Sequence, residues 1–147
     1  MMNREILFKA KRKDNGEWVE GYYLNIAKIN HFICTGKIKL DGALKGIIAP
    51  EMYAIDPDTI CQYTGLTDKN EQKIWENDII SISAYSYYEP EDDYFGVVTY
   101  CEKDVCWCLK NREESSEEVI CECFGSYTTE IINHGNIFDN ADLLEVE

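Results

Sequence analysis

The stretch TICQYTGLTDKNEQKIWENDII, residues 59–80, carries more information about the fold than any other part of the chain. Residues 59–64 combine β-branched and aromatic side chains and predict a strand. Gly65 follows, and a glycine takes the positive φ needed to leave a strand without a steric penalty. The stretch therefore begins with a strand that we expect to end at a glycine.

The rest of the stretch predicts two turns and the start of another strand. Residues 68–70 (DKN) predict the first turn, because Asp and Asn side chains accept hydrogen bonds from their own backbone. Ile74 and Trp75 return the chain to the core, and residues 77–78 (ND) supply the second turn. Ile79 then begins the next strand. The whole stretch is typical of a β protein.

A β-hairpin is predicted ahead of this stretch, from residues 6–11 and 18–24. Asp14-Asn15-Gly16 lies between them, and Asn-Gly is a strong hairpin signal because both residues tolerate positive φ. In the second strand one set of alternating side chains is expected to face the core, and the other set to be half exposed. The two sets are Val19, Gly21 and Tyr23, and Trp18, Glu20 and Tyr22.

The length and composition favour one β-rich domain. A chain of 147 residues buries roughly two-thirds of the surface that it exposes when unfolded, so a sizeable core is available. Ten Tyr, three Trp and five Phe favour strands over helices. Further strands are expected at residues 96–100, 106–110 and 119–124, with one helical turn after residue 139.

The order of these elements predicts the architecture. A turn, a D-I-I strand and a G-V-V-x-Y strand follow one another in small SH3-like barrels. We therefore expect a mainly β protein, with an SH3-like small barrel and an N-terminal strand-rich (α+β) subdomain. Both lie in a single domain, residues 1–147, with the N-terminal subdomain at 1–53 and the barrel-like one at 54–147.

Charge is spread unevenly along the chain. Residues 1–50 hold 9 Lys and Arg against 5 Asp and Glu, whereas residues 51–147 hold 5 against 23. Phosphate contacts depend on Lys and Arg, so the acidic portion opposes nucleic-acid binding. The asymmetry has two interpretations: solvated faces that keep the protein soluble, or a charged contact between subunits or with a basic partner.

The cellular compartment follows from what the sequence lacks. No early apolar stretch resembles a signal peptide, and no stretch approaches the length of a transmembrane helix. We therefore expect a cytoplasmic protein that does not bind membranes. Its seven Cys are then expected to be thiols rather than a disulfide framework.

Residues 59–80, which we call the hallmark stretch, resemble the characteristic sequence motif of the YopX family of small phage and prophage proteins. In that family a strand ending in Q-Y-T-G-L precedes a D-K-N-G-type turn, a hydrophobic-aromatic residue, an acid, a turn residue and D-I-V. The opening of this chain, with W-V-E-G at 18–21, and its H-G-N-I-F-D-N-A-D-L-L-E ending at 134–145 are similar to the family's ends. The resemblance implies a phage-derived accessory protein in a bacterial host cell, and no established activity comes with it.

The chain departs from the family pattern at a few positions. Cys61 stands where Gly is usual before Gln62, and Lys11 stands where an aromatic is common. Glu71-Gln72 replaces a Gly-centred turn, and Asn77 replaces another Gly. Asn accepts left-handed φ, so the departures bear on turn geometry more than on family membership.

Several motif residues could bind a ligand. They combine polar groups with two aromatic rings, which is the composition of a small pocket. The alternative is that their polar groups satisfy backbone donors of the turns, and this is the interpretation we favour. The residues are Gln62, Tyr63, Thr64, Gly65, Asp68, Trp75 and Asp78.

Four cysteines form a second candidate site, as Cys106-x-Cys108 and Cys121-x-Cys123. A hairpin over residues 105–124 would place 106 opposite 123 and 108 opposite 121, with all four thiols on one face. Tetrahedral zinc would need such a set, but strand pairs spread the sulfurs, and Cys also packs as a small hydrophobe. We favour core packing, with metal binding and redox chemistry as alternatives, and expect no cofactor.

Residues 85–94 (YSYYEPEDDY) predict an acidic, Tyr-rich loop. One interpretation is an exposed loop, and the other is a partner-binding loop, because Tyr is enriched at protein contacts. With the acidic run at 113–118, the loop could present carboxylates to a basic surface in the manner of a DNA mimic. The candidate contact residues are Tyr87, Tyr88, Glu89, Glu91, Asp92 and Asp93.

No catalytic signature is present. The chain has no nucleophile elbow, P-loop or dinucleotide fingerprint, and His31 and His134 stand about a hundred positions apart. We expect a non-enzymatic accessory protein that acts by protein–protein contact or self-assembly, with itself or a host or phage protein as partner. The alternative is a ligand- or metal-binding regulatory module. A weaker third hypothesis is nucleic-acid binding through Lys9, Lys11, Arg12 and Lys13.

Overall fold

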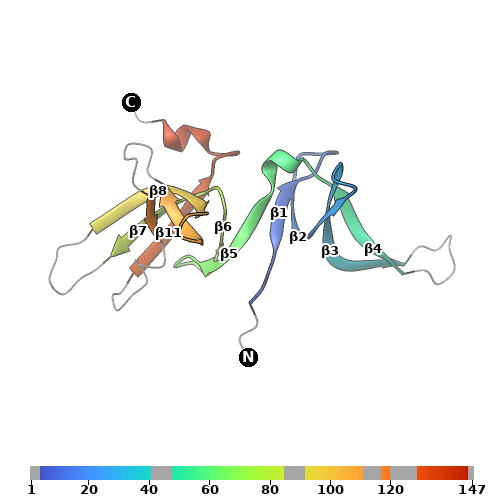
Figure 1. The fold of residues 1–147 in the computed structure, drawn as a ribbon, viewed down its shortest axis with the longest axis horizontal. Helices are drawn as coiled ribbons and strands as arrows, with labels where there is room; N and C mark the ends of the chain where they lie inside the picture. Colours follow the sequence, from blue (N-terminus) through green and yellow to red (C-terminus); the bar gives the residue numbers. More distant parts are fainter. Residues whose placement is uncertain (1–3, 41–47, 85–91, 111–116, 120–128, 146–147) are drawn as a thin grey trace. The chain divides into compact units, whose positions relative to one another are not determined.

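The computed structural model describes residues 4–40, 48–84, 92–110, 117–119 and 129–145, and the statements below refer to these residues (Figure 1). They are almost entirely strands and turns, which confirms the expected mainly β fold. The strands are β1 (Phe8–Lys11), β2 (Trp18–Ile26), β3 (Asn30–Leu40), β4 (Ile48–Ala54), β5 (Cys61–Thr67), β6 (Lys73–Trp75), β7 (Asp78–Ala84), β8 (Asp92–Cys101), β9 (Cys106–Lys110), β10 (Glu117–Val119) and β11 (Thr129–Asn136). Two short 3-10 helices, η2 (Pro57–Thr59) and η3 (Ala141–Leu144), accompany them.

The strands form two antiparallel sheets. The first has the order β4-β3-β2-β1-β5-β6, and the second has the order β10-β9-β8-β7-β11. The second sheet is open within the described residues, so the predicted small barrel is not closed there. The chain forms two compact units, Met1–Tyr63 and Thr64–Glu147. The boundary between them lies inside β5, whereas the predicted subdomain boundary was between residues 53 and 54.

The first unit is built around the predicted hairpin. β1 and β2 pair antiparallel with Ala10 opposite Val19, and Gly16 in the connecting turn has φ 72°. Position 21 in β2 requires glycine for a steric reason, because a Cβ there would lie 2.1 Å from the carbonyl oxygen of Cys34 in β3. The core consists of Ala10, Val19, Ile33 and Ile55, with Phe8, Tyr23, Tyr53 and Ile60 packed against it.

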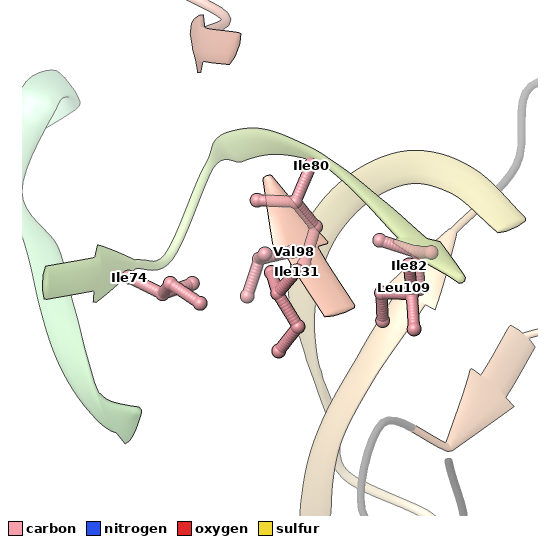
Figure 2. Packing of buried hydrophobic residues seen from close by; sticks show 6 residues of the cluster. All are labelled: Ile74, Ile80, Ile82, Val98, Leu109 and Ile131. Carbon is pink, nitrogen blue, oxygen red and sulfur yellow. The ribbon is translucent and has the colours of Figure 1, made fainter. Parts of the chain in front are cut away.

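The second unit has its own core. Figure 2 shows its six buried aliphatic side chains, which come from β6, β7, β8, β9 and β11. Leu66, Tyr94 and Trp107 pack against them. The alternation of β7 explains why Ile80 and Ile82 face this core. The six residues are Ile74, Ile80, Ile82, Val98, Leu109 and Ile131.

The hallmark stretch folds as a strand, a turn and two strands, with one change from expectation. Gly65 has the predicted positive φ, 88°, but the strand does not end there, because β5 continues to Thr67. Glu71 and Asn77 also have left-handed backbones, with φ 63° and 69°. These two positions are the ones at which the family pattern favours glycine.

Candidate contact surface and cysteine cluster

The two motif carboxylates are buried and face backbone donors. Asp68 is 6% exposed, and its Oδ1 accepts from the backbone N–H of Asn70 at 2.8 Å and of Gln72 at 2.9 Å. Asp78 is 2% exposed, and its Oδ2 accepts from the backbone N–H of Trp75 at 2.8 Å. Each carboxylate therefore organises one of the two turns that the sequence predicted.

Asn133 in β11 connects these carboxylates, and sequence reasoning did not identify it. Its side-chain Nδ2 donates to Asp78 Oδ2 at 2.8 Å, and its backbone N–H donates to Asp68 Oδ2 at 3.4 Å. Its own Oδ1 accepts from the Gly135 N–H at 2.9 Å, beside a register shift in the β7–β11 pairing. No local pattern marks this residue, because its partners lie 55 and 65 positions earlier.

The side chains of the remaining motif residues are largely buried or hydrogen-bonded within the protein. The Thr64 hydroxyl donates to the Ile74 carbonyl at 2.7 Å and accepts from the Leu66 N–H at 3.2 Å. Tyr63 and Trp75 are 8% and 4% exposed, and Gln62 is half buried opposite Phe8 of β1. These contacts agree with a structural role for the motif.

Most of the predicted partner loop falls outside the described residues. Tyr87, Tyr88, Glu89 and Glu91 are in that group, and Asp92 begins β8. Asp93 is exposed, and its Oδ1 accepts from the Ser83 hydroxyl at 2.8 Å on the neighbouring strand.

The predicted register of the cysteine hairpin is wrong. Cys108 pairs with Val119 of β10, so the two strands are offset by two residues from the expected pairing of 108 with 121. β10 begins at Glu117, whereas the predicted second strand began at residue 119. Cys121 and Cys123 lie outside the described residues.

Cys106 and Cys108 instead cluster with Cys101, which is not one of the four cysteines of the predicted site. Cys101 and Cys106 are direct partners in the β8–β9 pairing. The sulfurs of Cys106 and Cys108 are 3.9 Å apart. Burial, together with contacts to the Cys106 and Cys101 side chains, raises the pKa of the Cys108 thiol from 9.0 to about 12. The spacing 101/106 across a tight hairpin is a signal that could have found this cluster.

The described residues contain neither a cluster of metal ligands nor a membrane-spanning helix. Within the described ranges, no group of three or more His, Cys, Asp or Glu side chains has the arrangement that a metal ion requires. None of the helices in that part of the chain is long and apolar enough to cross a membrane.

The first unit presents an apolar row on the outer face of its sheet. Tyr22, Leu24 and Ile26 alternate along β2 on the face opposite the core, and they are 57%, 40% and 51% exposed. Ile29, in the turn before β3, is 77% exposed. Reading the alternation of residues 18–22 two steps further would have shown that the exposed face of β2 becomes apolar.

Neighbouring strands extend this apolar row. Directly opposite residues in antiparallel strands share a face. Cys34 of β3 therefore lies beside Tyr22, Phe32 of β3 lies beside Leu24, and Met52 of β4 lies beside Cys34. All three of these neighbours are half buried. We call Tyr22, Leu24, Ile26, Phe32, Cys34 and Met52 the outer face of the first unit.

Basic side chains lie on β1, the strand beside β2. The Lys9 ammonium is 4.6 Å and the Lys11 ammonium 5.4 Å from the centre of the Trp18 ring, which is a cation–π arrangement. Both lysines belong to β1, next to β2 in the sheet.

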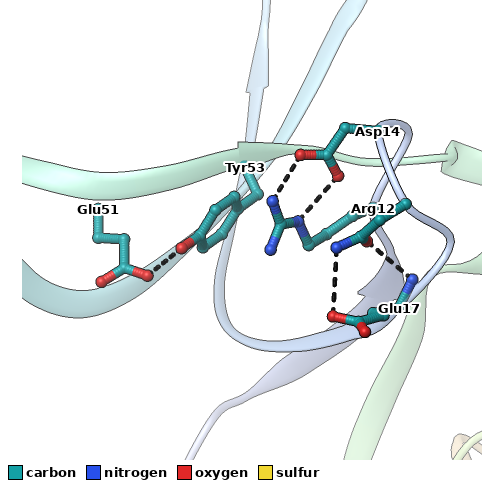
Figure 3. A network of polar contacts seen from close by, with 6 residues as sticks. Arg12, Asp14, Glu17, Glu51 and Tyr53 are labelled. Atoms are coloured by element: carbon teal, nitrogen blue, oxygen red, sulfur yellow. Dashed lines mark hydrogen bonds and ion pairs between the residues drawn. The ribbon is translucent and has the colours of Figure 1, made fainter.

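Arg12 is neutralised locally, as Figure 3 shows. Its Nε donates to Asp14 Oδ1 at 2.9 Å, a second bond joins the same two groups, and its guanidinium lies 3.9 Å above the Tyr53 ring. Hydrogen bonding to Arg12 lowers the pKa of the Asp14 carboxyl. The Tyr53 hydroxyl donates to Glu51, which raises the pKa of the Tyr53 phenol. Arg12 therefore fastens the β1–β2 turn to β4.

These features define a class: a mainly β protein of two antiparallel sheets, whose described polar motif is satisfied internally and whose first sheet exposes an apolar face. The model of the YopX protein family matches residues 7–145, and the chain belongs to that family. The match includes both sheets and the hallmark stretch. A comparison with curated proteins finds no match.

Proposed function

We propose that this chain is a phage- or prophage-derived accessory protein of the bacterial cytoplasm that acts without catalysis, by protein–protein contact or self-assembly. The observation that carries the proposal is the apolar row on β2. Tyr22, Leu24 and Ile26 expose between 40% and 57% of their surface on one face of one strand.

Burial of this apolar row in an interface would stabilise the complex. Fully burying one large apolar side chain stabilises by about 1.5–3 kcal/mol relative to leaving it exposed. Three such side chains in a row, with Phe32 of β3 and Met52 of β4 on the same face, match the apolar centre of a protein interface. Tyr22 is also of a residue type that is enriched among interface hot spots.

The charge distribution supports a contact with an acidic protein surface or a second copy of the chain. Lys9 and Lys11 lie in β1 beside β2, within a segment of net positive charge, whereas residues 51–147 are strongly acidic. Complementary charge raises association rates and fixes the orientation of partners. A second copy supplies such an acidic surface, as does an acidic host or phage protein.

The test is the molar mass of the purified chain, measured by light scattering after size-exclusion chromatography. A Leu24→Lys/Ile26→Lys variant places two charges in the apolar row. Asn25→Lys is the matched control, because Asn25 is exposed on the same strand but alternates with the row. We expect an oligomer for the native chain and for Asn25→Lys, and a monomer for the double variant.

If the native chain is a monomer, a second experiment searches for a different protein as the partner. Each variant is then used as bait in a nuclease-treated bacterial lysate. A protein retained by the native chain and by Asn25→Lys, and lost with Leu24→Lys/Ile26→Lys, supports the proposal. Equal molar mass and equal retention for all three proteins would overturn it.

A further inference from the structure

The β8–β9 hairpin brings two thiols directly opposite each other. Cys101 is the last residue of β8, Cys106 is the first residue of β9, and the two are register partners. Opposed residues of antiparallel strands have Cα atoms roughly 4.5–5.5 Å apart. A disulfide needs a Cα separation of about 4.4–6.8 Å. The backbone therefore already holds the two residues at a distance that a disulfide bridges.

We propose that Cys101 and Cys106 form a reversible dithiol–disulfide site, oxidised by low-molecular-weight disulfides of the glutathione type. The site belongs to the second unit and is independent of the proposed contact surface, which lies in the first. In the structure neither Cys101 nor Cys106 is part of a disulfide.

The two thiols differ in access. Cys106 is half buried, whereas Cys101 is 6% exposed and its thiol donates to Asp104 Oδ2 at 3.5 Å. The turn that joins them is open to solvent at Val105, which is 73% exposed. A small disulfide therefore reaches Cys106 first, and Cys101 is held behind it as the resolving thiol.

The exchange proceeds in two steps. The Cys106 thiolate attacks one sulfur of the small disulfide, which forms a mixed disulfide and releases one small thiolate. The Cys101 thiolate then attacks the Cys106 sulfur, breaks the mixed bond, forms the Cys101–Cys106 bond and releases the second small thiolate. The protein gives up two electrons and two protons, and the small disulfide becomes two thiols.

Among the cysteines that the structure describes, Cys108 is the competing resolving thiol, and its position disfavours it. It is two residues from Cys106 on the same strand, where a rise of about 3.3 Å per residue puts the Cα atoms near the outer limit for a disulfide. Cys108 is fully buried, and burial raises the pKa of its thiol to about 12, so it is a poor nucleophile. The 3.9 Å between the Cys106 and Cys108 sulfurs is a packing contact.

The turn geometry is a second observation at the same place. Val105 has φ 55°, a conformation that a β-branched residue rarely adopts. The strain lies directly beside Cys106, within the four residues that the disulfide would enclose. Strained backbone of this kind is found at functional sites when the surrounding structure maintains it.

The test uses the full chain, equilibrated with mixtures of reduced and oxidised glutathione and digested with trypsin without reduction. Cleavage after Lys73, Lys103 and Lys110 puts Cys101 in peptide 74–103 and both Cys106 and Cys108 in peptide 104–110. We expect a cross-linked pair of these peptides, whose amount rises with the proportion of oxidised glutathione and disappears after dithiothreitol treatment.

Cysteine variants assign the bond. Cys108→Ser and Cys34→Ser are expected to keep the cross-link, and Cys106→Ser and Cys101→Ser are expected to lose it. Circular dichroism of each variant checks that the sheet is intact, and Cys106→Ala provides a second variant at that position. A cross-link retained in Cys106→Ser, a bond within peptide 104–110, or glutathione adducts without any cross-link would each overturn the proposal.

Discussion

Thr64 and Thr99 show how a single hydroxyl affects this fold. Both are strand residues, but Thr64 donates to the Ile74 carbonyl and accepts from the Leu66 N–H. The Thr99 Oγ1 is buried and has no hydrogen-bond partner among the described residues. It lies opposite Cys108 on the face of the second sheet that carries the cysteine cluster. A buried hydroxyl without a partner lowers stability, whereas a paired one adds to it.

We predict opposite effects when each threonine is replaced by valine. Thr99→Val should raise the free energy of unfolding by about 1 kcal/mol, since it removes an unsatisfied polar atom with little change in shape. Thr64→Val should lower it by about 1–3 kcal/mol, because the Leu66 N–H and the Ile74 carbonyl lose their partner. Urea titration followed by Trp fluorescence measures both. Destabilisation of equal size in the two variants would contradict this account.

At the scale of elements, the two left-handed turn positions explain why the family favours glycine there. Glu71 has φ 63° and Asn77 has φ 69°. A non-glycine residue in this region costs about 1–2 kcal/mol, less for Asn. The chain therefore keeps the turn geometry of the family pattern without its glycines.

Glu71→Gly should therefore stabilise the protein, by about 0.5–1 kcal/mol. The relief of the left-handed conformation exceeds the extra entropy that glycine brings to the unfolded chain. Asn77→Gly should give a smaller gain. Glu20→Gly removes the same charge from an exposed strand position and should destabilise instead. Thermal unfolding of the three variants tests the order, and a loss of stability in Glu71→Gly would contradict it.

Element bounds were well predicted where local chemistry determines them. Residues 106–110 were predicted as a strand and coincide with β9, and Asn15-Gly16 correctly marked the hairpin. Local chemistry was insufficient at Gly65, where the positive φ was right and the strand end was wrong. It also failed for the β9–β10 register, because the sequence of residues 111–116 contains no Gly, Pro or Asn-Gly signal that fixes the pairing.

The site was less predictable than the fold, for a physical reason. The motif carboxylates were identified from the sequence, but their shared partner Asn133 is distant in the chain, and distant pairings leave no local periodicity. Cys101 was likewise absent from the predicted cysteine site, although the β8–β9 pairing places it against Cys106. Contacts that depend on strand register become visible only when the register is known.

At the scale of the whole molecule, the main electrostatic feature is the excess of acidic over basic residues. The chain carries 28 Asp and Glu against 14 Lys and Arg, and the whole excess of acid is in residues 51–147, because residues 1–50 have more Lys and Arg than Asp and Glu. Like charges repel one another in the compact state more than in the expanded one, and salt screens that repulsion.

We predict that the melting temperature rises with ionic strength. Between about 10 mM and 500 mM sodium chloride the Debye length falls from about 30 Å to below 10 Å. Screening worth about 1 kcal/mol would raise the melting temperature by about 2–4 °C for a chain of this size. Sucrose at matched osmolality serves as an uncharged control. A melting temperature that falls as salt is added would mean that attractive ion pairs outweigh the repulsion.

The contacts of Asn133 also bear on the order in which the chain can be completed during synthesis. β7 and β8 leave the ribosome well before β11, which pairs with β7 and brings Asn133 to both motif carboxylates. Until residues 129–136 emerge, one edge of β7 has no strand beside it, and Asp68 and Asp78 lack their common donor. Nascent chains are therefore exposed to edge-to-edge association until their final strand arrives, and a polypeptide interrupted before β11 becomes a substrate for chaperones and proteases.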